Sequence, residues 1–173
     1  MKVMVISDIH GNVEKLNKAI ERYYEEEANW IFILGDFSNY FSSFSDDEIA
    51  QILNNRGGKV FAIRGNCDTE DFEKMLDFKL TDVKTIEVNG IKVTFSHGHL
   101  YNFNRLPPEC GDIFIQGHTH CGGMYKVEDR IFANCGSISK PRGGSVCSYI
   151  LLSEEAIFLK SLEGEVLQTI NLK

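Results

Sequence analysis

Apolar runs that end in metal-ligating side chains are the feature that most constrains how this chain can fold. All five histidines lie in three short clusters, and each cluster follows a run typical of a buried strand. The three segments are Val3–His10, Val93–His99 and Ile113–His120. Two further apolar runs end in Gly35-Asp36 and Gly65-Asn66. Because strand ends can hold side chains on a rigid frame, we expect one metal site assembled at one edge of a sheet.

The first half of the chain alternates between strand and helix patterns. Strands are predicted over 2–7, 30–34 and 59–63. Asn12 is expected to cap a helix from Val13 to Glu27. The apolar stripe of this helix repeats at helical spacing through Val13, Leu16, Ile20, Tyr23 and Tyr24.

Two shorter helices are predicted farther along this half. The sequence Ser45-Asp46-Asp47-Glu48 matches a capping box and is followed by the apolar residues of a second helix. A third, short helix is expected after Thr69, with Phe72, Met75 and Leu76 as its buried face.

The second half is predicted to be mostly β. Val83–Val88 and Ile91–Phe95 flank Asn89-Gly90, which is a strong signal for a two-residue hairpin turn. Further strands are predicted over 112–116, 123–127, 130–133, 146–152, 156–161 and 166–172. We therefore expect a single α/β domain over residues 1–173, with two packed sheets and helices on the outside.

Composition narrows the class of partner. The 173 residues are 43% hydrophobic and 25% charged, which is ordinary for a globular protein with a sizeable core. The net charge is −7 and the sequence pI is about 5.2, which disfavours broad binding to nucleic acid or an anionic membrane. A phosphate ester remains compatible with this charge where metal ions reverse the local field.

The N-terminus and the cysteines favour a cytoplasmic protein. The apolar run at the start of the chain stops at Ser7-Asp8, which is too early for a signal peptide or a membrane span. The five cysteines contain no Cys-x-x-Cys pair. An odd number without a secretory signal is typical of reduced thiols rather than a disulfide framework.

The donor set predicts two metal ions. The donors are two aspartates, one asparagine and up to five imidazoles, a mixture that suits manganese, iron, zinc, cobalt or nickel. Seven plausible ligands exceed what one tetrahedral zinc needs, and suit two ions bridged by a carboxylate. In an extended chain, residues two apart face the same way, so each Asp-x-His or His-x-His pair is expected to aim at one centre. Any one of these motifs alone is more often a simple turn, but five in order, each after a strand, favour a metal site.

The same residues resemble the calcineurin-like metallophosphoesterase superfamily, and within it the small single-domain phosphodiesterases of the YfcE type. The last part of the match, Asn134–Ser137 with Pro141-Arg142-Gly143, resembles a C-terminal loop of that subgroup. The blocks that carry the resemblance are Asp8-Ile9-His10-Gly11-Asn12, Gly35-Asp36, Gly65-Asn66-Cys67-Asp68, Ser96-His97-Gly98-His99 and Gly117-His118-Thr119-His120.

The resemblance implies a four-layer α/β/β/α sandwich of two mixed sheets flanked by helices. It also implies two divalent metal ions, with manganese as the first choice and iron, zinc, nickel or cobalt as alternatives. Asp36 would bridge the two ions. The first ion would be held by Asp8, His10, Asp36 and His120, and the second by Asp36, Asn66, His97 and His118.

The implied activity is hydrolysis of small phosphate esters by a metal-bridging hydroxide, as in a phosphodiesterase or phosphatase. Candidate catalytic residues are Asn66, His99 and Cys67, and candidate substrate contacts are Asn12, His99 and Arg142. Many superfamily members have a histidine as proton donor at the position of Cys67, whereas the YfcE-like subgroup also carries cysteine there. A thiol is the weaker proton donor, so the general acid is left unassigned. His99 could alternatively orient a ligand, and Arg142 could be a surface residue.

Other functions compete with hydrolysis. The resemblance extends to the retromer subunit Vps29, which would make this chain a protein-interaction scaffold with little or no catalysis. A nuclease is a third reading, which the acidic composition disfavours. We expect a small phosphate ester as partner, no nucleic acid and no membrane, with homo-oligomerisation open. Aromatic residues Phe37, Tyr40, Phe41 and Phe44 could line a substrate cleft or instead cover the core or an interface.

Overall fold

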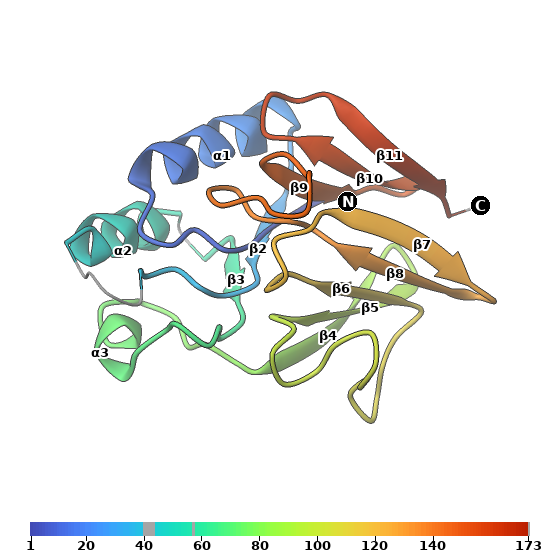
Figure 1. The fold of residues 1–173 in the computed structure, drawn as a ribbon, viewed down its shortest axis with the longest axis horizontal. Helices are drawn as coiled ribbons and strands as arrows, with labels where there is room; N and C mark the ends of the chain where they lie inside the picture. Colours follow the sequence, from blue (N-terminus) through green and yellow to red (C-terminus); the bar gives the residue numbers. More distant parts are fainter. Residues whose placement is uncertain (40–43, 57, 173) are drawn as a thin grey trace.

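Two β-sheets packed against each other form the frame of the protein (Figure 1). The computed structural model describes residues 1–39, 44–56 and 58–172. The first sheet has the order β11-β10-β9-β1-β2-β3 and consists of β1 (Val3–Ile6), β2 (Trp30–Ile33), β3 (Val60–Ala62), β9 (Ser148–Leu152), β10 (Ala156–Ser161) and β11 (Val166–Asn171). The second has the order β4-β5-β6-β8-β7 and consists of β4 (Val83–Val88), β5 (Ile91–Ser96), β6 (Ile113–Gln116), β7 (Gly123–Val127) and β8 (Arg130–Asn134).

Each sheet contains three neighbouring parallel strands. In the first sheet β1, β2 and β3 run parallel, and in the second β5, β6 and β8 do. The remaining strands pair antiparallel, so both sheets are mixed. Because the carboxyl ends of neighbouring parallel strands meet at one edge, the loops that follow these strands are brought together.

Two apolar layers hold the elements in place. Between the sheets, Phe32 of β2 stacks on Phe95 of β5 with ring centroids 4.1 Å apart. On the outer face of the first sheet, the helices bury residues such as Leu16 and Ile49 against β1 and β2. The helices are α1 (Val13–Glu25), α2 (Asp46–Asn54) and α3 (Glu70–Glu73).

The outer face of the second sheet is covered differently. Among the described residues no helix lies there, and Phe103 of the loop between β5 and β6 packs edge-on against Phe114 and Phe132. The expected α/β fold with two mixed sheets is thus confirmed, with a loop as the outer layer on this side. Among the described residues, no helix has the length and apolar character that crossing a membrane requires.

Local signals in the sequence predicted several elements well. Asn89 and Gly90 have φ values of 52° and 82° in the β4–β5 turn, as a two-residue hairpin requires. Asn12 caps α1, because its Oδ1 accepts a hydrogen bond of 2.9 Å from the Lys15 amide. The helix ends at Glu25, two residues earlier than predicted, and Glu27 beyond it is left-handed, with φ 53°.

Several local predictions differ from the structure. The Ser45 hydroxyl does not cap α2 but donates to the Gly11 carbonyl oxygen at 2.8 Å, which ties α2 to the loop after β1. Met75 lies beyond the end of α3 and is 40% exposed. Leu76 also follows the helix, although it packs against the core, and Tyr24 of α1 is exposed.

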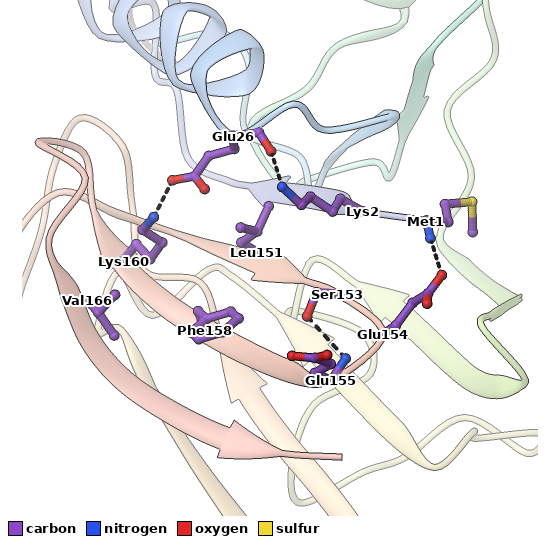
Figure 2. Close-up of a pocket in the computed structure, with 10 residues that line it drawn as sticks. All are labelled: Met1, Lys2, Glu26, Leu151, Ser153, Glu154, Glu155, Phe158, Lys160 and Val166. Atoms are coloured by element: carbon purple, nitrogen blue, oxygen red, sulfur yellow. Dashed lines mark hydrogen bonds and ion pairs between the residues drawn. The ribbon is translucent and has the colours of Figure 1, made fainter. Parts of the chain in front are cut away.

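A cleft of about 530 Å³ lies on the outer face of β9 and β10, near the C-terminal end of α1 (Figure 2). Lys160 of β10 forms an ion pair with Glu26, and the Tyr149 hydroxyl donates to the same carboxylate at 2.6 Å. Lys2 donates to the Glu26 carbonyl oxygen at 2.9 Å. Met1 and Lys2 precede β1, whereas Asp8 and His10 follow it, so this cleft lies at the opposite end of the strand from the predicted metal site.

The Glu26 contacts give a pH-dependent stability. Burial acts to raise the pKa of Glu26, but Lys160 and Tyr149 outweigh it and lower the pKa below its ordinary value. The stabilisation is therefore full above the ordinary carboxyl pKa and is lost as pH falls through the lowered value. We expect Glu26→Gln to cost about 1–2 kcal/mol of unfolding free energy at pH 7, a difference that shrinks below about pH 4.

Urea unfolding across this pH range measures the effect. Glu163→Gln is the matched control, because Glu163 pairs with Lys18 at the surface and its loss should leave stability unchanged. A Glu26→Gln deficit that stayed constant from pH 7 to about pH 3 would contradict the assignment.

Candidate metal centre

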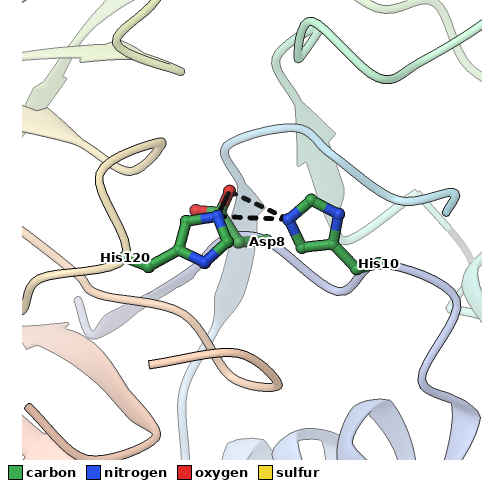
Figure 3. A group of neighbouring side chains, drawn as sticks. All are labelled: Asp8, His10 and His120. Atoms are coloured by element: carbon green, nitrogen blue, oxygen red, sulfur yellow. Dashed lines mark hydrogen bonds and ion pairs between the residues drawn. The ribbon is translucent and has the colours of Figure 1, made fainter. Parts of the chain in front are cut away.

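The loops at the carboxyl ends of the parallel strands bring the seven predicted ligands together. On one side, Asp8, His10 and His120 converge (Figure 3). Asp8 Oδ1 lies 3.1 Å from His120 Nε2, and the Nε2 atoms of His10 and His120 are 3.2 Å apart. His10 Nε2 lies 3.6 Å from Asp36 Oδ2. These atoms form the first centre.

A second group of donor atoms lies on the other side of Asp36. His97 Nε2 is 3.1 Å from Asn66 Oδ1, 3.2 Å from His118 Nδ1 and 3.4 Å from Asp36 Oδ1. The two carboxylate oxygens of Asp36 therefore face different groups, Oδ2 toward His10 and Oδ1 toward His97. This is the arrangement a bridging ligand needs, and it groups the same side chains that the family resemblance assigns to each ion.

The spacing and the unpaired oxygen fit bound cations. Two atoms that each lie about 2.1 Å from one ion are about 3.0–3.4 Å apart at the usual coordination angles. The His10–His120 and His97–His118 nitrogen pairs have this separation. Asp8 Oδ1 is buried and lies 3.1 Å from His120 Nε2, but among the described residues it accepts no well-aligned hydrogen bond, and a bound cation would satisfy it.

The Nδ1 atoms of two histidines fix the orientation and the tautomer of their rings. His97 Nδ1 is 2.5 Å from the Leu34 carbonyl oxygen, and His120 Nδ1 is 2.6 Å from the Lys140 carbonyl oxygen. A carbonyl oxygen only accepts, so each Nδ1 donates. In the neutral ring the Nε2 lone pair then points into the centre, as a metal ligand requires.

Electrostatics keep the Asp8 carboxylate ionised. Burial acts to raise the pKa of Asp8, but His10 and His120 outweigh it and hold that pKa below its usual range. Burial and the neighbouring His97 lower the pKa of His118, which favours the neutral, ligand-competent ring. Burial also acts to lower the pKa of His120, but Asp8 and the Lys140 carbonyl reverse the sign and raise it.

Five of the predicted ligands have left-handed backbone conformations, which the sequence did not reveal. Their φ values are 59° for Asp8, 47° for His10, 54° for Asp36, 67° for His118 and 62° for His120. Non-glycine residues adopt this region rarely and at a cost, and such residues concentrate at functional sites.

The left-handed backbone shows that the extended-chain argument for the Asp-x-His and His-x-His pairs was wrong. The expectation that residues two apart face one centre assumed extended chain, but β1 ends at Ile6 and β6 ends at Gln116. His118 and His120 lie in the loop beyond β6 and divide between the two groups. Asp8 and His10 do share a centre, although through left-handed turns rather than a continued strand.

The Asp36 loop is fixed by its neighbours Gly65 and Asp68. The Asp68 carboxylate accepts hydrogen bonds from the backbone amides of Asp36, Phe37 and Gly65 at 2.9, 2.8 and 2.7 Å. Burial raises the pKa of Asp68 to about 6, with Asp36 adding to the rise and the amide donors opposing it. A Cβ at Gly65 would lie 2.2 Å from Asp36 Oδ1, so only glycine fits there.

Cys67 and His99 lie beside the ligands. The Cys67 thiol belongs to a group with His10 and Asp36 whose donor atoms all lie within 4.8 Å of one another. Burial, with the charge of Asp36, raises the pKa of Cys67 to about 12, which keeps the thiol protonated. His99 has its ring centroid 5.2 Å from that of His97, and its buried Nδ1 has no hydrogen-bond partner among the described residues. Burial and the two neighbouring imidazoles lower the pKa of His99.

The other predicted substrate contacts lie farther out. Asn12 uses its Oδ1 to cap α1, which leaves its amide nitrogen for a ligand. Arg142 is exposed in the loop beside His120, and its backbone amide donates to the His120 carbonyl oxygen at 3.0 Å. Of the aromatic residues, Phe37 is buried against Phe72 and Phe44 is exposed, whereas Tyr40 and Phe41 lie outside the described residues.

Sequence reasoning assigned a substrate contact to Arg142 in the loop that follows β8, but no role to Asn134, Ser137 or Ser139. Asn134, Ser137 and Ser139 hydrogen-bond to the ligand loops, as described below. The available signal was the run Asn134-Cys135-Gly136-Ser137 directly after a predicted strand, the same context in which the ligands occur.

The fold and these ligands belong to a known class. Residues 1–156 match the calcineurin-like phosphoesterase superfamily domain, and the chain belongs to this family, whose members generally bind divalent metals. It is 31% identical over 173 residues to phosphodiesterase YfcE of Escherichia coli strain K12, an alignment that covers 95% of this chain and 94% of that protein. The solved structure of YfcE, a phosphoesterase from E. coli, superposes with a TM-score of 0.92 at 27% identity and full coverage of both chains.

More distant relatives share the architecture. Phosphodiesterase MJ0936 of Methanocaldococcus jannaschii is 24% identical over 159 residues, which cover 87% of each chain. Vps29 of Entamoeba histolytica, solved in complex with zinc, has a TM-score of 0.71 at 21% identity and full coverage of both chains. At that identity the likeness shows a common fold.

Gly65 provides a test of the Asp36 geometry. We expect Gly65→Ala to displace the Asp36 carboxylate, to lower metal affinity by at least about tenfold and to destabilise the fold by about 1–3 kcal/mol. Gly123→Ala is the control, because a Cβ there meets nothing within 4 Å. Metal titration calorimetry and urea unfolding report the two effects, and a Gly65→Ala protein that binds metal like Gly123→Ala would refute the close contact.

Proposed function

We propose that the protein is a metal-dependent phosphodiesterase that hydrolyses small phosphate esters at a centre of two divalent ions. The observation that carries the proposal is the Asp36 carboxylate, whose two oxygens face two separate groups of donor atoms. Membership of the phosphoesterase family and similarity to proteins named phosphodiesterase support it.

The chain supplies the ligands and the surroundings for this chemistry. Two divalent ions would acidify a water for attack on phosphorus and offset the charge that builds up on the phosphate oxygens. Asp8, His10 and His120 would hold one ion, and Asn66, His97 and His118 the other. Asp36 would keep the two sites at a fixed separation. The mixed nitrogen and oxygen donors suit manganese, iron, zinc, nickel or cobalt. Of these we propose manganese first, as the family resemblance implies.

The residues around the ligands favour esters with good leaving groups. With its raised pKa, the Cys67 thiol is a poor source of a proton for a departing alkoxide. His99 offers a neutral imidazole beside the second group, and Arg142 offers a guanidinium beside His120. We assign them to the substrate's phosphate oxygens. The net charge of −7 argues for a small ester rather than a nucleic acid. An odd number of cysteines without a Cys-x-x-Cys pair supports a cytoplasmic location.

A protein-interaction scaffold of the Vps29 type is the alternative. It draws on the shared fold, while the complete set of converging ligands supports catalysis. Retention of a stable protein partner by a variant that has lost its ligands, together with absent hydrolysis in the unaltered protein, would favour the scaffold.

Hydrolysis of a generic aryl phosphodiester in the presence of manganese is the direct test. We expect Asp36→Asn and His97→Ala each to lower the rate by at least about 100-fold, because each removes a ligand of the centre. Asp71→Asn is the control, since Asp71 lies exposed on α3 and Lys74 is its one ion-pair partner within the part of the chain that the structure describes. Equal rates in all four proteins, or no hydrolysis in any, would reject the proposal.

Metal should also stabilise the folded protein. A ligand that binds only the native state adds about 2.7 kcal/mol at a concentration 100 times its dissociation constant. We therefore expect manganese to raise the melting temperature of chelator-treated protein, and His97→Ala to respond less. Identical melting curves with and without manganese in the unaltered protein would speak against a metal centre.

A further inference from the structure

Residues at the end of β8 and in the loop that follows it hydrogen-bond to the loops that carry the ligands after β1 and β6. Asn134 is only 4% exposed and Ser137 is fully buried, so both side chains lie inside the protein. The mechanism proposed above gives neither of them a task. Both side chains, however, donate hydrogen bonds to backbone carbonyl oxygens of the loops that carry the ligands.

Asn134 holds the loop that carries His118 and His120. Its Nδ2 donates to the Gly117 carbonyl oxygen at 2.8 Å and to the Thr119 hydroxyl at 3.0 Å. Its Oδ1 accepts from the Gly136 amide at 2.9 Å, which fixes the orientation of the side-chain amide. The two histidines both have left-handed backbones, so this loop needs outside contacts to keep its shape.

Ser137 and Ser139 hold the backbone of Asp8. Both hydroxyls donate to the Asp8 carbonyl oxygen at 2.8 Å, and Asp8 has a φ of 59°. In the same loop, the Lys140 carbonyl oxygen accepts from His120 Nδ1. Among the described residues, no hydrogen bond joins this loop to the side chains of Asn66 or His97. The loop therefore supports the first centre directly and the second only through His118.

We propose that Asn134 and Ser137 are positioning residues of the metal centre. Ser137, together with Ser139, sets the affinity of the first ion through Asp8, whereas Asn134 sets the affinity of both ions through His118 and His120. The proposal rests on the two-ion centre proposed above. Partners that orient metal ligands typically contribute 10–100-fold in affinity, without touching the metal themselves.

A merely structural role would give a different pattern. It would lower the stability of the metal-free protein and weaken both ions alike. A positioning role separates the two ions, because the serine hydroxyls act on Asp8 alone. The ratio of the two affinities is therefore the informative quantity.

The experiment is titration of metal-free protein with manganese by calorimetry, beside thermal melting without metal. We expect Ser137→Ala with Ser139→Ala to weaken one of the two ions by about 10–100-fold and leave the other within about threefold. We expect Asn134→Ala to weaken both ions by about 10–100-fold without a matching loss in the melting temperature of the metal-free protein, which a merely structural role would lower. Ser161→Ala is the matched control, because its buried hydroxyl accepts from the Glu165 amide in the β10–β11 turn, and both affinities should stay unchanged.

Several outcomes would overturn the proposal. Unaltered affinities in the Asn134 and serine variants would do so, as would equal weakening of both ions in the serine variant. If the double variant does not fold, Ser139→Ala alone removes one of the two bonds to Asp8 and must still weaken one ion selectively. Unaltered protein that binds two ions but hydrolyses no ester would reject the proposed function and leave this proposal standing. Unaltered protein that binds fewer than two ions would overturn both.

Discussion

The shared carboxylate of Asp36 is the contact on which the rest of the site depends. Its oxygens lie 3.6 Å from His10 Nε2 and 3.4 Å from His97 Nε2, so a small displacement would disturb both groups of ligands together. Several neighbouring residues fix the position of this side chain. The Cys67 amide donates to Oδ1, Asp68 accepts from the amides of Asp36 and Phe37, and the missing side chain of Gly65 leaves the space that the carboxylate occupies. Placing two buried aspartates among five imidazoles is tolerable because the imidazoles and the amides face the charge.

The sheets and the site have a common origin in the parallel strands. Three strands of each sheet run parallel, and their carboxyl ends open at the same edge. β1, β2 and β3 deliver Asp8, Asp36 and Asn66, while β5 and β6 deliver the histidines of the second sheet. The remaining parallel strand, β8, delivers the supporting loop. The apolar layer between the sheets, with Phe32 against Phe95, therefore sets the distance between ligands that come from different sheets.

The sequence predicted those features that depend on residue type and order. Apolar runs followed by Asp, Asn or His indicated both the strands and the ligands, and Asn89-Gly90 indicated the hairpin. The sequence did not predict features in which a side chain can choose between hydrogen-bond partners that only the folded chain brings close. Ser45 has the residue type of a helix cap, but the Gly11 carbonyl takes its hydroxyl. The division of His118 and His120 between two groups depends on left-handed backbone that non-glycine residues rarely adopt. Asn134 and Ser137 bind backbone atoms distant in sequence, which no local pattern encodes.

The left-handed residues also bear on how this protein tolerates mutation. Each such conformation costs on the order of 1–2 kcal/mol. Substitution by glycine would remove this cost at any of the five positions, but it would also remove the side chain that serves as a ligand. This unfavourable free energy is offset by packing in the two apolar layers, which lie away from the ligands. Substitutions in those layers that leave smaller or poorly fitting side chains would therefore lower the free energy of unfolding. The conformation of the ligand loops would then be lost although no ligand had been changed. In this family member, core residues such as Phe32 and Leu16 and the metal ligands are expected to be under one joint selection.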